Sequence, residues 1–85
     1  IEKSEIEQAL NNLPGIIDSY VLTKELEDST QLIGYIVLSE EGRKLEWYKE
    51  ALLDKIPNYM VPAYLVQIKK FPLTFNGKID DTQLL

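Results

Sequence analysis

The chain has 85 residues with 45% hydrophobic and 27% charged side chains and a net charge of −5, which is typical of one small globular domain and too acidic for a nucleic-acid partner. It contains no cysteine and no histidine, which excludes disulfides, thiol catalysis, a histidine-based catalytic triad and, in practice, a zinc site. Because it shows neither a signal peptide nor an apolar run approaching the ~20 residues of a membrane span, we expect a cytoplasmic domain with no membrane partner.

The charges are unevenly distributed, and the start of the chain suggests a fragment. Residues 1–42 contain nine acids and two lysines, whereas residues 43–85 contain five acids and seven bases. The chain begins at Ile1 without an initiator methionine, and its first residues already have the pattern that precedes a helix. We therefore expect residues 1–85 to be one domain of a longer multidomain protein.

The first expected element is a helix that begins near Ser4. Ser4 and Glu7 match the S-x-x-E capping box, in which the two side chains satisfy free backbone amides at a helix start. Apolar residues then recur at a spacing of three and four and form one stripe: Ile6, Ala9, Leu10 and Leu13. The Pro14-Gly15 pair ends this helix.

Two β-rich runs follow, at residues 16–22 and 32–38, and both are typical of structural strands. The polar stretch between them, residues 24–31, predicts an exposed hairpin connection. Its acidic side chains are most simply interpreted as solvated: Glu25, Glu27 and Asp28. The nearby glycines do not form a phosphate loop, because Gly34 lies inside a predicted strand and Gly42 follows two glutamates.

A second amphipathic helix is predicted over residues 44–56, and Pro57 ends it. Five residues share its apolar face: Leu45, Tyr48, Leu52, Leu53 and Ile56. Trp47 falls outside this stripe, and we expect it to pack at an edge. A connector with a proline at each end, residues 57–62, then leads to a third strand at residues 64–68.

The C-terminal stretch FPLTFNGKID, residues 71–80, contains the strongest turn signal in the chain. Asn76 and Gly77 are typical of a two-residue type I′ hairpin, in which both residues need positive φ. The turn presents Lys78, the one residue with a defined position and a reactive side chain. Two less specific roles stay open for this side chain: a solvated surface lysine, or part of a small phosphate or carboxylate site near Lys69 and Lys70.

Two adjacent acids follow this turn. We expect Asp80 or Asp81 to cap a final short helix that begins near Thr82. A magnesium site formed by this pair and Asp54 is the alternative, but adjacent acids before a helix are more often caps, and we predict no metal ligands. Together the elements predict an α+β fold: a small three-stranded sheet with two helices packed on it, and a C-terminal β-hairpin that carries the lysine.

The segment IPNYMVPAYLVQIKKFPLTFNGKID, residues 56–80, closely resembles the C-terminal subdomain of adenylate-forming enzymes, specifically the adenylation domains of nonribosomal peptide synthetases. The family pattern there ends in PLT-x-NGK-[VI]-D-R. The opening IEKSEIE likewise resembles the family's IELGEIE segment. The resemblance covers essentially the whole chain; its two ends are specific, whereas the middle matches only in layout.

The resemblance implies roles for two groups of residues. Lys78 corresponds to the family's catalytic lysine, which reaches the substrate carboxylate and the α-phosphate of ATP, and Asn76 and Gly77 correspond to the turn that presents it. Residues 1–7 correspond to the segment that faces the pantetheine tunnel after the small subdomain rotates. The residues concerned include Glu2, Lys3, Ser4 and Glu5.

The resemblance also implies the reaction and its components. The chain would be the mobile lid of a ligase that forms aminoacyl-AMP from an amino acid and ATP and then transfers the aminoacyl group to the phosphopantetheine thiol of a peptidyl carrier domain. ATP and Mg²⁺ would be bound mainly by an N-terminal large subdomain, and the chain alone would be inactive. Two alternatives stay open: a non-catalytic carrier-docking or regulatory module of the same fold, and the lid of an acyl or aryl acid ligase.

The chain departs from the family pattern at three positions. Ser4 stands where glycine is common, and its side chain lies where the resemblance implies a close backbone approach to the thiol tunnel. Phe75 replaces a frequent proline at the entry to the turn, and Asp81 replaces the usual arginine, so that an anion stands near Lys78 where the family has a cation.

Overall fold

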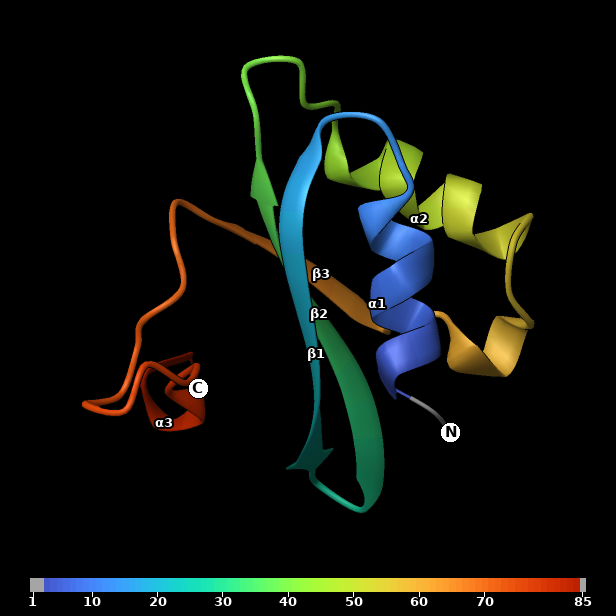
Figure 1. Cartoon of the computed structure of the whole chain (residues 1–85). Helices are drawn as coiled ribbons and strands as arrows, with labels where there is room; N and C mark the ends of the chain where they lie inside the picture. The colour runs from blue at the N-terminus through green and yellow to red at the C-terminus, as the bar shows by residue number, and fades with distance from the viewer. Residues whose placement is uncertain (1–2, 85) are drawn as a thin grey trace.

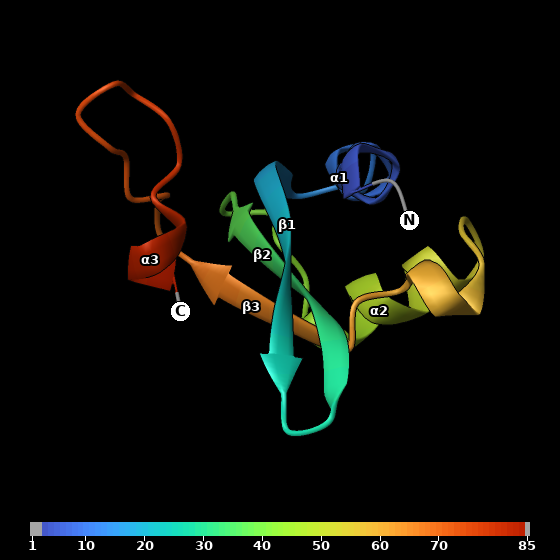
Figure 2. The same ribbon diagram turned by 90° about the horizontal axis from the view of Figure 1, so that it is seen from below.

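The computed structural model describes residues 3–84, which form a three-stranded sheet with two helices on one face and the C-terminal segment on the other (Figure 1, Figure 2). The elements in chain order are α1 (Lys3–Asn11), β1 (Ile16–Leu26), β2 (Ser29–Leu38), α2 (Leu45–Leu53), the 3₁₀ turn η1 (Asn58–Met60), β3 (Tyr64–Ile68) and α3 (Asp81–Leu84). The α+β fold with a three-stranded sheet and helices is therefore confirmed. Over residues 3–84, every helix is too short or too polar to cross a lipid bilayer.

The sheet has the order β1-β2-β3, with β2 in the centre. β1 and β2 are antiparallel, and β2 and β3 are parallel. Because parallel neighbours need a crossover connection, the chain passes through α2 and η1 between them. This crossover places α2 on the same face of the sheet as α1, as Figure 2 shows.

The β1–β2 hairpin is much longer than the sequence predicted. Pairing continues to Leu26 and Ser29, so that only Glu27 and Asp28 form the turn, with a positive φ of 55° at Glu27. The predicted hairpin is therefore confirmed, but its connection is shorter than predicted, because residues 24–26 and 29–31 are paired strand. Alternation of apolar and polar residues marks a strand only where one face is buried, and this end of the hairpin extends beyond the core as a ribbon that is solvated on both faces.

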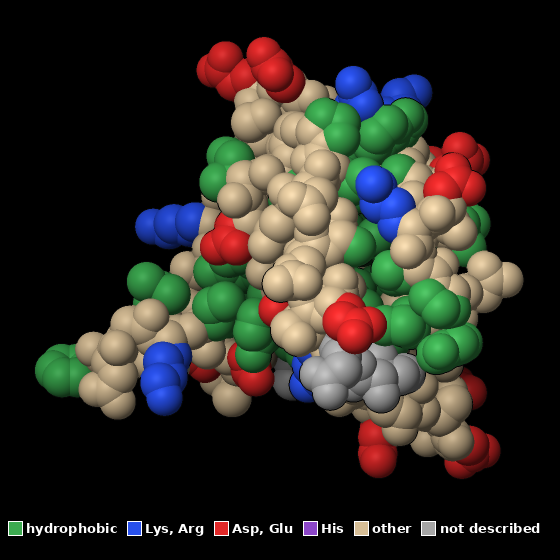
Figure 3. All heavy atoms as spheres, turned by 45° about the vertical axis from the view of Figure 1, so that its right-hand side comes forward, with side chains coloured by type: hydrophobic (Ala, Val, Ile, Leu, Met, Phe, Trp, Pro, Cys, Tyr) green, Lys and Arg blue, Asp and Glu red, His purple; other side chains and the backbone are tan. Residues whose placement is uncertain are grey.

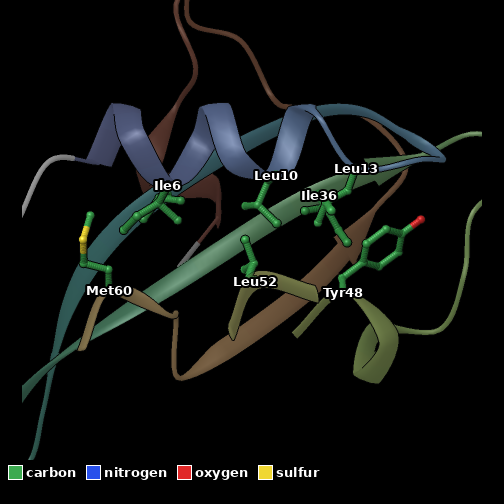
Figure 4. Packing of buried hydrophobic residues seen from close by; sticks show 8 residues of the cluster. Ile6, Leu10, Leu13, Ile36, Tyr48, Leu52 and Met60 are labelled. Carbon is green, nitrogen blue, oxygen red and sulfur yellow. The ribbon is translucent and has the colours of Figure 1, made fainter. Parts of the chain in front are cut away.

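The core lies between the sheet and the two helices (Figure 4). The predicted stripes of α1 and α2 meet there, and five of their residues, together with one from β2 and one from η1, are buried: Ile6, Leu10, Leu13, Ile36, Tyr48, Leu52 and Met60. Burial of each such side chain contributes about 1.5–3 kcal/mol. The helix predicted over residues 44–56 ends earlier, at Leu53, because the amides of Lys55 and Ile56 both bond to the Leu52 carbonyl ahead of Pro57.

Tyr48 connects α2 to the turn that ends α1. Its hydroxyl donates to the Pro14 carbonyl at 2.8 Å and accepts from the Arg43 amide at 3.0 Å. Gly15 has a φ of 83°, and a Cβ there would lie 2.7 Å from this hydroxyl, so glycine is required at the turn. Beside it, Trp47 packs edge-on to Tyr48 at 5.3 Å and lies under the Arg43 guanidinium, in the expected edge position.

The predicted capping box is absent from α1. The described helix begins at Lys3, so Ser4 lies inside it, and the Glu7 carboxylate accepts from the Val21 amide at 2.7 Å. β1 is an edge strand, so its outward amides need partners from outside the sheet. Glu7 therefore connects α1 to β1 and does not form a capping box with Ser4.

Candidate functional site

Residues 72–80 form a loop that projects away from the sheet on the side opposite α1 (Figure 2). Its base is closed by a hydrogen bond from the Asp80 amide to the Pro72 carbonyl at 2.8 Å and by a single antiparallel bridge between Leu73 and Ile79. We call this segment the lysine loop. The predicted C-terminal hairpin is thus reduced to one bridge and a turn.

The turn of the lysine loop has three residues, not two. The Thr74 amide donates to the Lys78 carbonyl at 2.6 Å, and the Gly77 amide donates to the Thr74 carbonyl at 2.9 Å. Gly77 has a φ of 83°, but Asn76 does not have positive φ, so the type I′ assignment is wrong. Asn-Gly also fits a three-residue turn whose last residue is left-handed, and here Phe75 takes the first position.

Lys78 lies directly after the turn with an exposed side chain. Within residues 3–84 its ammonium group has no hydrogen-bond or ion-pair partner, and its backbone amide is held by the Thr74 hydroxyl at 3.2 Å. Two apolar neighbours are also unpacked: Phe75 is fully exposed, at 104%, and Leu73 is 60% exposed. The loop therefore offers one free cation between apolar side chains that the described residues do not cover.

The two carboxylates at the end of the loop, Asp80 and Asp81, have structural partners. Asp80 accepts from the Thr82 amide and hydroxyl and from the Gln83 side chain, and these hydrogen bonds lower its pKa. This confirms that Asp80 caps α3. Within residues 3–84, no cluster of three or more acidic side chains has the arrangement of a metal site, and Asp80 and Asp81 are both engaged in other hydrogen bonds.

Asp81 is bound by Tyr20 of β1, a contact that the sequence did not reveal. The Tyr20 hydroxyl donates to Asp81 Oδ1 at 2.7 Å, and its ring meets Phe71 edge-on at 6.1 Å. The hydrogen bond to Asp81, with smaller effects of burial and of the charges of Asp81 and Glu7, raises the pKa of Tyr20 to about 12. The partners are 61 positions apart, so no local pattern in the sequence connects them.

The two predicted site segments lie on opposite sides of the sheet (Figure 1, Figure 2). Lys3, Ser4 and Glu5 form the exposed first turn of α1, on the helix-covered face, and Glu2 lies outside the described residues. The lysine loop extends from the other face. The structure therefore does not bring these segments together into one site.

The view onto α1 and α2 in Figure 3 shows hydrophobic side chains at the surface, with acidic and basic side chains scattered among them. Several large apolar residues of α2, η1 and β3 are exposed: Trp47, Leu53, Tyr59, Tyr64 and Val66. Lys69 and Lys70 are exposed at the start of the C-terminal segment.

The chain matches one family model and many proteins. The model of the AMP-binding enzyme C-terminal domain matches residues 5–78, which include the turn and Lys78. Bacitracin synthase 1 of Bacillus licheniformis is 39% identical over 80 residues, covering 94% of this chain and 2% of that protein. The Anguibactin system regulator of Vibrio anguillarum is 37% identical over 91 residues, covering 99% of this chain and 9% of that protein.

A solved structure has the same fold over the whole chain. The crystal structure of a holo four-domain nonribosomal peptide synthetase bound to AMP and glycine has a TM-score of 0.93 and 34% identity, covering 100% of this chain and 6% of that one. The chain therefore spans less than a tenth of the length of each of these three proteins.

Proposed function

The chain belongs to the AMP-binding enzyme C-terminal domain family, as the C-terminal domain of an adenylate-forming enzyme of the nonribosomal peptide synthetase type, and we propose that it is the mobile lid of an amino-acid-activating adenylation domain. The observation that carries this proposal is the free Lys78 ammonium on a closed, projecting loop. Its partners would be an N-terminal large subdomain of the same protein and a peptidyl carrier domain.

In the first half-reaction, the amino-acid carboxylate attacks the α-phosphorus of ATP, pyrophosphate leaves, and aminoacyl-AMP forms. Two anions meet in this step, and negative charge accumulates on the phosphoryl oxygens. A cation held at that position stabilises the transition state electrostatically. Lys78 would supply this cation, and the turn with Asn76 and Gly77 would aim it.

ATP and Mg²⁺ would be bound mainly by the large subdomain. The described residues contain no carboxylate cluster that fits a divalent cation. When bound, Mg²⁺ neutralises phosphate charge, whereas this chain contributes the lysine. The related synthetase structure contains AMP and glycine, which are two components of such a reaction.

In the second half-reaction, the phosphopantetheine thiol of the carrier attacks the aminoacyl carbonyl, a thioester forms, and AMP leaves. We propose that Glu2, Lys3, Ser4 and Glu5 face the thiol in this step; the last three form the start of α1, and Glu2 lies outside the described residues. The argument is geometric: the described start of α1 and the lysine loop lie on opposite sides of the sheet. A rigid-body rotation of the lid would therefore move the lysine loop away from the reacting atoms and bring the start of α1 toward them.

A second candidate function is favoured by one specific observation. The similarity to the Anguibactin system regulator covers nearly the whole chain, and it agrees with a regulatory or carrier-docking module of the same fold that performs no catalysis. In such a protein Lys78 would have no substrate, and its replacement would leave the activity of the assembly unchanged.

Amino-acid-dependent exchange of pyrophosphate into ATP separates the two candidates. It should be measured for residues 1–85 alone, for the large subdomain alone and for the complete protein, with a panel of amino acids. The lid proposal predicts exchange by the complete protein and none by residues 1–85. Exchange by residues 1–85 alone, or none by the complete protein with any amino acid, would contradict it.

A further inference from the structure

Tyr20 contacts both ends of the lysine loop. Its ring packs against Phe71, one position before the loop begins, and its hydroxyl donates to Asp81, one position after the loop ends. We propose that Tyr20 is a positioning residue for Lys78, which acts by holding the two ends of the loop on β1. This inference rests on the proposed catalytic role of Lys78.

The orientation of the lysine loop is set by the contacts at its base. The loop is closed internally, by the Asp80–Pro72 hydrogen bond and the Leu73–Ile79 bridge. Its turn is fully exposed, and the Phe75 side chain touches nothing that would steer it. A small rotation at the base therefore moves the amine by a larger distance, and a misplacement of ~1 Å at a reacting centre can cost ~100-fold in rate.

Contacts to the sheet are concentrated at this base. On the face opposite the helices, Leu22, Ile33 and Tyr35 are buried, and Phe71 and Tyr20 pack against them. Apolar packing of this kind holds the segment down but gives it little directional constraint. The Tyr20–Asp81 hydrogen bond, at 2.7 Å to a carboxylate, supplies the direction next to the loop, and the Tyr35 hydroxyl donates to the Leu84 carbonyl farther along the segment.

The identity of residue 81 fits this arrangement. The family pattern has arginine there, which has no acceptor for a phenol, whereas Asp81 accepts from Tyr20. Asp81 accepts from Tyr20 through Oδ1, and the Lys78 ammonium has no hydrogen-bond or ion-pair partner within residues 3–84. The Tyr20–Asp81 hydrogen bond therefore holds the chain directly after the loop, while the amine itself stays unpaired within the described residues.

The test uses the complete enzyme and two separate half-reactions. Tyr20→Phe removes the hydroxyl and keeps the ring on Phe71, and Asp81→Ala removes the acceptor. Each should lower the kcat of pyrophosphate exchange by about 5- to 20-fold with little change in KM for the amino acid or ATP. Thioester formation from supplied aminoacyl-adenylate should change by less than about twofold, since the lysine loop serves the other half-reaction.

A double variant and two controls complete the test. If both residues act through one hydrogen bond, Tyr20→Phe with Asp81→Ala should lose no more activity than either change alone. Tyr64→Phe, which removes the hydroxyl of an exposed tyrosine on β3, should leave exchange unchanged. Lys78→Ala, measured in parallel, tests the catalytic role on which the inference rests.

The possible results are distinct. A large loss with Lys78→Ala together with normal exchange in Tyr20→Phe would overturn the positioning role and leave the proposed function standing. Equal losses of both half-reactions in Tyr20→Phe would also overturn it, because the residue would then support the lid as a whole. Normal pyrophosphate exchange in Lys78→Ala would contradict the proposed function itself.

Discussion

The two faces of the sheet are held by different kinds of interaction. On the helix-covered face, side chains such as Ile6, Leu10 and Leu52 are completely buried, and the contacts are apolar (Figure 4). On the opposite face, the C-terminal segment is attached by a small apolar cluster and by hydrogen bonds from Tyr20 and Tyr35. Apolar burial is not directional and mainly sets stability, whereas the hydrogen bonds set the orientation of an exposed loop. Substitutions on the first face should therefore change stability, and those on the second should change activity.

The largest effect on stability is expected from the helix-covered face. Leu10→Ala leaves a cavity between α1 and the sheet and should lower the free energy of unfolding by about 2–5 kcal/mol. A domain of this size has a total stability at or below ~5 kcal/mol, so the variant should keep at most about 3 kcal/mol and unfold at a much lower urea concentration. Leu73→Ala, in the exposed lysine loop, is the matched control and should change stability by less than about 0.5 kcal/mol. Urea unfolding followed by circular dichroism checks both, and equal effects would remove the distinction between the two faces.

A smaller effect, on activity more than on stability, is expected at Gly77. Its φ of 83° disfavours a β-branched residue, although no atom lies within 4 Å of a Cβ placed there. Gly77→Val should thus introduce about 1–3 kcal/mol of backbone strain in the turn. The exposed loop can relieve this strain by changing its conformation, which displaces Lys78. Exchange by the complete enzyme should fall while the melting temperature changes little. Gly77→Asn, which tolerates this conformation better, should retain more activity; normal exchange in Gly77→Val would show that the turn does not aim the lysine.

The smallest expected effect is a change in the pKa of Tyr20 when its hydrogen bond to Asp81 is removed. Its folded-state pKa is raised from 10.0 to about 12, chiefly by the hydrogen bond to Asp81, so the protonated phenol stabilises the fold below about pH 10. This contribution is lost as the pH rises through about 12. Ultraviolet absorbance of tyrosinate should show a titration step near pH 12 that belongs to Tyr20. That step should be absent in Tyr20→Phe and shifted to lower pH in Asp81→Ala; an unchanged titration in Asp81→Ala would contradict the hydrogen bond.

Features that depend on neighbouring residues could be predicted from the sequence. The stripe Ile6, Leu10 and Leu13 predicted α1 and its buried face because helical spacing is a local property. The turn at Gly77 was also expected, but Asn-Gly fits two turn lengths, and only the Thr74–Lys78 pairing distinguishes them. The far end of the β1–β2 hairpin could not be predicted, because its residues are mostly polar. Strands that pair without being buried need no alternation of apolar and polar residues in their sequence.

Features that depend on distant residues could not be predicted. Glu7 satisfied a local capping pattern and yet bonds to Val21, 14 positions away, because an edge strand offers a free amide there. Asp81 was recognised only as a departure from a family pattern, and its partner Tyr20 is 61 positions away. The resemblance predicted which residue carries the amine, whereas the structure revealed what holds its loop.

The central claim is that Lys78 serves the first half-reaction and the start of α1 serves the second. The most direct measurement compares Lys78→Ala in the two half-reactions of the complete enzyme, with Lys69→Ala as a control at an exposed lysine outside the loop. Adenylation should fall by about 10²–10³, as for loss of one preorganised transition-state donor, while KM values should change little because the proposal assigns substrate binding to the large subdomain. Transfer from supplied aminoacyl-adenylate to the carrier thiol should proceed at close to the normal rate. Equal losses in both half-reactions would contradict the claim, because Lys78 would then support the structure of the lid and would not act on one reaction.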